Sequence, residues 1–290
     1  MPSVVYAPMQ SFQWDGQVHE LAPGLTVNRF TTFPDVAGME QHLSKVEHDR
    51  AANASHWLVY EVDETVTVSI VEITNLVLIS LWLVRPTRTH IQFRFVVDAA
   101  AQGPHRVSRV LERFSWIEDT AATHYSTDDL IEASRLFLSL NRILENRGRL
   151  ADALVLTTIG CWSHGWQVSL ICHAAAIEAL LTYAQGGGLA RRLASTFACL
   201  TEIEVANRNL AYLEFWELYA ARSDVMHGRM FNVPQGQRLN ILDRIQTILR
   251  RLWRRIALDP VEIAALEGND DLRRQYFSPL ENGFNAPPPP

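Results

Sequence analysis

The stretch Leu218-Tyr219-Ala220-Ala221-Arg222-Ser223-Asp224-Val225-Met226-His227-Gly228 closes a long helical pattern that begins near Thr201. Gly228 is a natural end for a helix, because glycine adopts the left-handed conformation after the last turn without steric cost. His227 then falls in the last turn, where unpaired backbone carbonyls favour positive charge. The stretch therefore predicts a helix whose C-terminal end carries a group of polar side chains.

The polar residues of this stretch are spaced so that they can act together. Arg222 lies about 140° around the helix from His227, and its long side chain can still reach the space beside the imidazole. Ser223 and Asp224 precede His227 by four and three residues, so either side chain can meet the ring. Together they offer a permanent cation and a group that titrates near neutrality. The alternative is an ordinary surface charge beside a helix-capping histidine.

Helical periodicity extends from Ser126 almost to the end of the chain. Apolar residues three and four positions apart predict an amphipathic helix from Leu130 to Leu144. Further helices are expected at residues 149–160, 166–184, 189–200, from 201 onward, 238–258 and 261–276. The helical domain is therefore predicted to span residues 125–276, followed by a disordered tail at 277–290 that ends in four prolines.

The first part of the chain has a different pattern. Runs of Val, Ile, Leu, Phe, Trp and Thr separated by short turn signals predict four antiparallel strands, at residues 56–62, 65–73, 76–85 and 91–97. Residues 1–55 are irregular in pattern, with a short polar helix expected at 35–50. A linker at 99–104 and a short helix at 106–116 follow. The sequence thus predicts an α+β chain, with a β-rich domain at residues 1–105 before an all-α bundle.

Charge is unevenly distributed along the 290 residues. The whole chain has a formal net charge of −6, but residues 191–255 contain 11 arginines, no lysine and six acids, a local charge of +5. Arg244, Arg251 and Arg255 form one basic stripe on a predicted helix. This stripe is expected to be either a solvated face or a surface that contacts RNA.

The remaining motifs exclude several kinds of site. The three cysteines Cys161, Cys172 and Cys199 lie in apolar helical surroundings, which suits buried thiols in a reducing compartment. Cys172 and His173 are adjacent on one helix, so their side chains diverge and no metal site or other cofactor is expected. No signal peptide is recognised, and the longest apolar run, Leu76–Val84, is too short to span a bilayer. We therefore expect a cytoplasmic protein without a membrane partner.

Three features taken together resemble a known family. The first is the Arg-x4-His pattern from Arg222 to His227, with Tyr219 before it and Gly228 after it. The second and third are upstream helices that carry His173-Ala174-Ala175-Ala176-Ile177-Glu178-Ala179-Leu180-Leu181 and Leu189-Ala190-Arg191-Arg192-Leu193-Ala194. This combination is similar to the HEPN superfamily (higher eukaryotes and prokaryotes nucleotide-binding), in particular its Apea-like branch. The resemblance covers residues 125–275.

The resemblance implies a metal-independent endoribonuclease, acting in phage defence or as a toxin, with an antitoxin or a sensor as a possible partner. The Arg and His of the family's motif correspond to Arg222 and His227. Many active members carry Asn, Asp or His directly after the Arg, where this chain has Ser223 and then Asp224. The alternative is therefore a non-catalytic HEPN module that binds RNA, a nucleotide or a partner protein.

Neighbouring residues are assigned by the same argument. Tyr219, Arg229 and Glu178 are candidates for binding the RNA substrate, and Ser223 or Asp224 would orient the imidazole. Glu178 has two further interpretations, as a helix-packing residue or as a partner of Arg222. RNA supplies its own nucleophile, the 2′-hydroxyl, so cleavage needs only a base, an acid and a cation. Because one copy offers a single His227, a symmetric homodimer with a composite site is expected.

Overall fold

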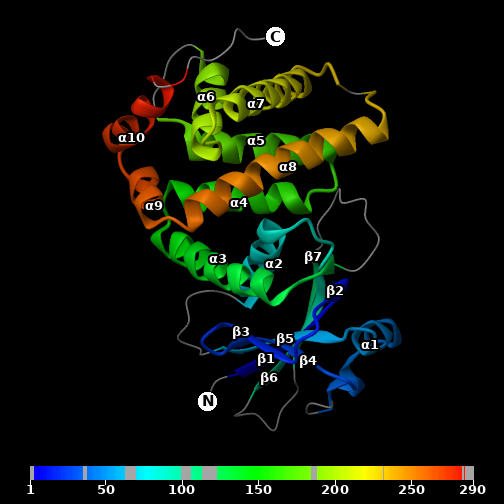
Figure 1. Ribbon diagram of the computed structural model, residues 1–290. Coiled ribbons are helices and arrows are strands. Elements are labelled where there is room, and N and C mark those ends of the chain that lie inside the picture. Colours follow the sequence, from blue (N-terminus) through cyan, green and yellow to red (C-terminus); the bar gives the residue numbers. More distant parts are fainter. Residues whose placement is uncertain are drawn as a thin grey trace. The chain divides into compact units, whose positions relative to one another are not determined.

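The computed structural model describes residues 3–34, 38–62, 70–98, 106–112, 123–183, 188–230, 232–282 and 284. Contacts divide the chain into two units, Met1–Leu138 and Ser139–Pro290. The division falls inside helix α3 (Thr127–Asn146), whereas the sequence placed it in the segment 99–125. The fold class is as expected, since an antiparallel sheet is followed by a mostly helical region (Figure 1).

The first unit is built on a six-stranded antiparallel sheet with the order β3-β4-β5-β1-β6-β7. Its strands are β1 (Ser3–Met9), β3 (Val18–Ala22), β4 (Leu25–Arg29), β5 (His56–Val62), β6 (Ile91–Asp98) and β7 (Arg106–Glu112). Two further strands, β2 (Phe12–Gln13) and β8 (Thr123–His124), pair in parallel. Pro8 is tolerated in β1 because the pairing with β6 covers only Ser3–Tyr6, so Pro8 lies beyond it.

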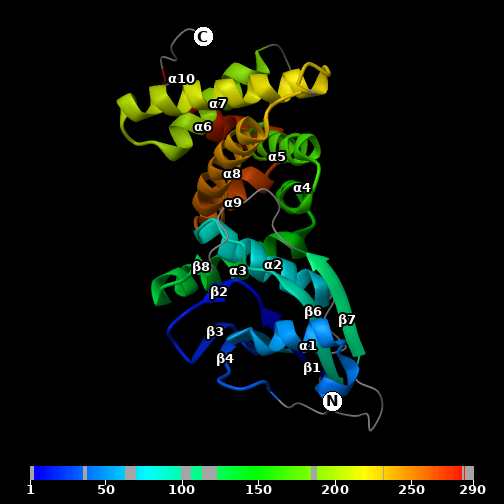
Figure 2. The ribbon, with the colours of Figure 1, turned by 90° about the vertical axis from the view of Figure 1, so that its right-hand side faces the viewer.

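Alternating residues of the sheet face two different layers. On one face Trp57, Phe93 and Phe95 form a buried cluster with the short helix η1 (Met39–His42) and helix α1 (Lys45–Ala52). On the other face the Tyr60 hydroxyl and the Arg94 Nε lie 3.2 and 2.7 Å from the Thr74 hydroxyl of helix α2 (Ile70–Val84). The sheet is therefore covered by helices on both faces (Figures 1 and 2).

Helix α2 replaces two of the predicted strands. The strands expected at 65–73 and 76–85 are wrong over residues 70–84, which are helical, and residues 65–69 lie outside the described part of the chain. Every residue from Leu76 to Leu83 is buried. A helix that is apolar on all sides shows no 3.6-residue period, so its sequence resembles that of a buried strand.

Other predictions for the first unit are also corrected. The described part of residues 1–55 is not irregular, because β1 to β4 lie there; β1, β2 and β4 pair with strands distant in sequence, and β3 pairs with β4. The expected helix at 106–116 is strand β7 over Arg106–Glu112, which gains its hydrogen bonds from β6. The helix expected at 35–50 is split into η1 and α1, because Ser44 and Glu47 form a capping box that starts α1 at Lys45; residues 35–37 lie outside the described part.

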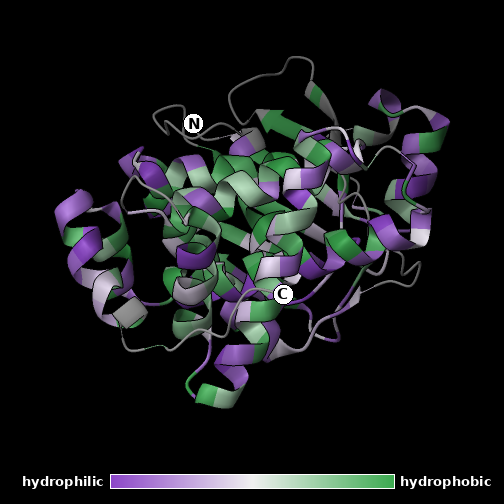
Figure 3. Ribbon diagram, turned by 90° about the horizontal axis from the view of Figure 1, so that it is seen from above, coloured by the Kyte–Doolittle hydropathy of each residue, from purple (hydrophilic) through white to green (hydrophobic). Residues whose placement is uncertain are grey.

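The helical unit follows the predicted pattern closely. After α3 come α4 (Arg149–Trp162), α5 (Trp166–Leu181), α6 (Leu189–Thr201), α7 (Val205–Met226) and α8 (Gln235–Ala257). Figure 3 shows helices with hydrophobic colours along one side and hydrophilic colours along the other. In α8, for example, Ile241, Ile245 and Leu252 are buried whereas Arg254 is exposed. These amphipathic faces form the core of the unit.

The end of the chain differs from the prediction in two ways. The single helix expected at 261–276 is two helices, α9 (Pro260–Glu267) and α10 (Asp270–Asn282), because Gly268 interrupts it and Asn269 caps the second helix. Residues 277–282 are helical, so a disordered tail does not begin at 277; residues 285–290 lie outside the described part. None of the described helices is long and apolar enough to cross a membrane.

Candidate functional site at the end of helix α7

Helix α7 ends in a motif that fixes the direction of the chain. The Gly228 N–H donates to the Val225 carbonyl at 3.0 Å, and the Arg229 N–H donates to the Asp224 carbonyl at 2.8 Å. Gly228 has a φ of +70°, and His227 is the C-cap residue. These are the two hydrogen bonds of a Schellman motif, so the helix stop predicted at Gly228 is confirmed.

Arg222 is held by the neighbouring helix α5. Its Nη2 atom lies 3.1 Å from Glu178 Oε1, and the two side chains are 28% and 25% exposed. Its Cζ atom lies 5.5 Å from the centroid of the Tyr219 ring, within the range of a cation–π contact. The structure therefore confirms the interpretation of Glu178 as a partner of Arg222.

Tyr219 completes this cluster. Its hydroxyl donates a hydrogen bond of 2.8 Å to the same Glu178 Oε1 atom that Arg222 contacts. Burial, and then the hydrogen bond to Glu178 and its negative charge, raise the pKa of Tyr219 to about 12, although the Arg222 charge opposes them. Tyr219 thus remains a neutral hydrogen-bond donor at physiological pH.

His227 and the residues after Arg222 are arranged differently from the expectation. The His227 side chain is exposed, and its backbone N–H donates to the Ser223 carbonyl at 3.0 Å. The Asp224 carboxylate lies 3.4 Å from Arg229 Nη1, so this acid pairs with Arg229 and does not orient the imidazole. Ser223 likewise makes no side-chain hydrogen bond to His227 within the described residues. His227 is therefore free to meet a ligand.

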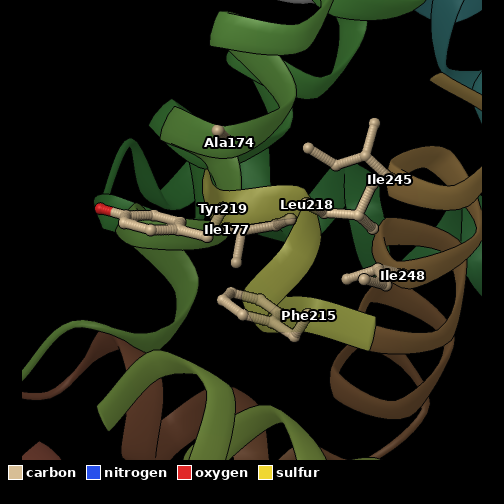
Figure 4. Close-up of a pocket in the computed structure, with 7 residues that line it drawn as sticks. All are labelled: Ala174, Ile177, Phe215, Leu218, Tyr219, Ile245 and Ile248. Carbon is tan, nitrogen blue, oxygen red and sulfur yellow. The ribbon is translucent and has the colours of Figure 1, made fainter. Parts of the chain in front are cut away.

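A small apolar pocket lies beside the cluster. It is lined from α5, α7 and α8, and its empty volume of about 240 Å³ includes space open to solvent. Figure 4 shows Tyr219 extending away from the other labelled residues, with its hydroxyl oxygen at the far end. The Tyr219 ring also stacks on Phe215, with centroids 6.1 Å apart. The side chains that line the pocket therefore pack around the Tyr219 ring, and apart from Tyr219 they are all apolar. Its lining residues are Ala174, Ile177, Phe215, Leu218, Tyr219, Ile245 and Ile248.

The basic stripe on α8 is neutralised by acidic side chains. Arg244 Nη2 lies 2.9 Å from Glu217 Oε2, and Arg255 Nε lies 2.7 Å from Glu262 Oε1. Arg251 is paired with Glu202. Of the two interpretations of the stripe, the structure therefore favours a face of ion pairs over one that is free to bind RNA phosphates.

The second candidate histidine lies in the core. His173 on α5 is completely buried, and burial lowers its pKa to about 3. None of the three cysteines forms a disulfide bond; Cys161 is buried as expected, whereas Cys172 and Cys199 are partly exposed. Within the described residues, no group of three His, Cys, Asp or Glu side chains could hold a metal ion.

Comparison with known proteins adds no assignment. The chain matches no protein family, no curated protein and no solved structure. The interpretation of the site therefore depends on its own geometry. The sequence missed the hydrogen bond from Tyr219 to Glu178, although the three-residue spacing of Tyr219 and Arg222 indicated a shared helix face.

Proposed function

We propose that this protein is a metal-independent endoribonuclease of the HEPN type, with its site at the C-terminal end of α7. One observation carries the proposal. Arg222 is fixed against Glu178 and Tyr219, while His227 is exposed at the end of the same helix. A fixed cation and an accessible imidazole are the groups that RNA cleavage through its own 2′-hydroxyl requires.

The proposed reaction assigns one role to each group. The 2′-hydroxyl loses its proton to a base and its oxygen bonds to the adjacent phosphorus, while the bond from phosphorus to the 5′-oxygen breaks and an acid gives that oxygen a proton. His227 serves as the base or as the acid. The planar guanidinium of Arg222 stabilises the negative charge that develops on the phosphoryl oxygens. The products are then a 2′,3′-cyclic phosphate and a 5′-hydroxyl end.

The reaction benefits from both an acid and a base, and a second copy of the chain would supply the missing group. His173 cannot serve, because it is buried and its pKa is lowered to about 3. An isologous contact at the end of α7 would place two His227 side chains in one cleft. Met226, 53% exposed beside His227, provides apolar surface for such a contact. Two facing Arg222–His227 pairs repel, so phosphate would strengthen the contact and salt would weaken activity.

The proposal extends to the setting of the enzyme. An RNA-cleaving toxin or phage-defence effector acts in the cytoplasm and needs an antitoxin or sensor to control it. Cys161, Cys172 and Cys199 form no disulfide bond, which suits that reducing compartment. The second candidate is a non-catalytic module that binds RNA, a nucleotide or a partner protein, and it is favoured by the departure at Ser223 from the family's motif.

The test is cleavage of total RNA by purified protein in the presence of EDTA. His227→Ala removes the exposed imidazole and should abolish cleavage, because no other described group at this site can replace it. His164→Ala is the matched control, since His164 is an exposed histidine of the same unit outside the site. It should cleave like the wild type.

The outcomes separate the two candidate functions. Cleavage that survives chelation, depends on His227 and leaves cyclic phosphate ends supports the ribonuclease. Equal behaviour of the wild type and His227→Ala excludes this site as catalytic. Binding of RNA without cleavage by any variant supports the non-catalytic module.

A further inference from the structure

Two donors converge on a single carboxylate oxygen beside the proposed site. The Tyr219 hydroxyl and the Arg222 Nη2 lie 2.8 and 3.1 Å from Glu178 Oε1. Glu178 belongs to α5, whereas Tyr219 and Arg222 lie three residues apart on α7. The carboxylate therefore joins the two helices at this point.

The guanidinium of Arg222 is confined on more than one side. The Tyr219 ring lies 5.5 Å from its Cζ atom, and its Nε atom is buried without a hydrogen-bond partner. An unpartnered buried N–H costs free energy, so the group is not in the position that its own hydrogen bonding would choose. Its contacts with Glu178 and Tyr219 offset that cost.

The orientation of Tyr219 is itself fixed by packing. Its ring lines the apolar pocket and stacks on Phe215, as Figure 4 shows, while its hydroxyl extends away from the pocket. Because the ring is held, the hydroxyl has one direction in which to donate, and Glu178 accepts there. Packing in the core therefore orients Tyr219, Tyr219 orients the Glu178 carboxylate, and Glu178 orients Arg222.

We infer that Glu178 and Tyr219 are positioning residues for Arg222 and do not bind the substrate themselves. The inference depends on the proposed function, because it assigns them to the orientation of the cation that stabilises the phosphoryl transition state. Both polar groups already have their partners in the cluster, which leaves the exposed part of the guanidinium for the phosphate. A preorganised donor acts on the transition state more than on the ground state.

The test compares Glu178→Ala, Glu178→Gln and Tyr219→Phe for cleavage of an oligoribonucleotide in EDTA. Glu178→Ala should lower kcat about 100-fold and change KM less than about threefold, since misplacing a transition-state donor has that scale of effect. Glu178→Gln retains an acceptor oxygen and should recover most of the loss. Tyr219→Phe, which keeps the ring but loses the hydroxyl, should lower kcat about 10-fold.

Glu217→Gln is the matched control. It removes an ion pair between α7 and Arg244 of α8, away from the cluster, and should leave kcat unchanged. A merely structural role of Glu178 would lower the unfolding temperature while kcat of the folded variant stays at the wild-type value. If Glu178 instead blocks Arg222 from contacting RNA, Glu178→Gln should bind RNA more tightly and cleave it faster. Either result overturns the inference.

A second readout does not depend on cleavage. The Arg222 Nε–H is buried and should give a resolved signal in side-chain ¹H–¹⁵N spectra, assigned by its loss in Arg222→Ala. The signal should broaden in Glu178→Ala and Tyr219→Phe but not in Glu217→Gln. A sharp signal in both cluster variants shows that they do not hold Arg222. If the signal broadens in both cluster variants but the wild-type protein does not cleave RNA, Glu178 and Tyr219 do position Arg222, and the proposed ribonuclease activity is wrong.

Discussion

At the scale of single residues, His173 is a titratable side chain that is buried within the helical unit. It is completely buried, its Nδ1 atom has no hydrogen-bond partner, and Gln246 Nε2 lies 3.4 Å from its Nε2. A β-carbon at Gly160 of α4 would lie 2.5 Å from the ring, so the ring packs directly against this glycine. Only the neutral imidazole fits this environment.

The pKa of His173 therefore predicts a loss of stability in acid. The folded value is lowered to about 3, so between pH 6.5 and 3 the unfolded chain binds a proton that the folded chain does not. The free energy of unfolding is therefore not reduced by His173 above pH 6.5, and it falls as the pH decreases below that value. Between pH 7 and 4.5 the wild type should lose roughly 2–3 kcal/mol more than His173→Leu.

The measurement is urea unfolding of both proteins at several pH values. The His173→Leu variant carries the same carboxylates, so it subtracts their contribution from the pH dependence. If the free energy of unfolding changes with pH equally in both proteins, His173 takes up its proton as readily in the folded state as in the unfolded state.

Helical spacing allowed several contacts of the site to be predicted at this scale. Tyr212, Trp216 and Tyr219 follow one another at four- and three-residue spacing, which indicates one helix face, and all three are at least partly buried. The pairing of Asp224 with Arg229 was missed, since Arg229 lies beyond Gly228, where the chain turns back and helical spacing no longer applies.

At the scale of elements, the end of α7 depends on the conformation of one glycine. Gly228 has a φ of +70°, which a residue with a β-carbon adopts at a cost of about 1–2 kcal/mol. Gly228→Ala should therefore lower the free energy of unfolding by that amount. It should also reduce RNA cleavage, because His227 is the adjacent C-cap residue.

Gly236→Ala is the control for this prediction. Gly236 lies in the first turn of α8, is exposed and has open space where a β-carbon would be added. Alanine there should be neutral or stabilise by up to about 1 kcal/mol. If the two alanine variants unfold at the same urea concentration, the left-handed conformation of Gly228 is not the cause.

Helices could be predicted from the sequence where only one of their faces is buried. The helices α3, α6 and α8 carry apolar residues on one face and so show a helical period, which is why their ranges were found. α2 is buried on every side from Leu76 to Leu83 and shows no period. Strands β1, β2 and β4 pair with strands far away in the sequence, which local patterns do not encode.

At the scale of the whole molecule, the positive charge of residues 191–255 is partly balanced along helix α8. The three arginines of the α8 stripe are paired with acids, which removes them as a general RNA-binding face. RNA recognition is then expected at the end of α7, where Arg222 and His227 lie. Under the proposal of a composite site, specific activity should therefore depend on contact between the α7 ends of two copies of the chain.

The most direct measurement is RNA cleavage in EDTA over a dilution series, with sedimentation of the same samples. The proposal of a composite site predicts that specific activity falls in proportion to the fraction of dimer, and that His227→Ala is inactive at every concentration. Full specific activity from a monomer would contradict the composite site. Absence of cleavage from a dimer would contradict the ribonuclease itself.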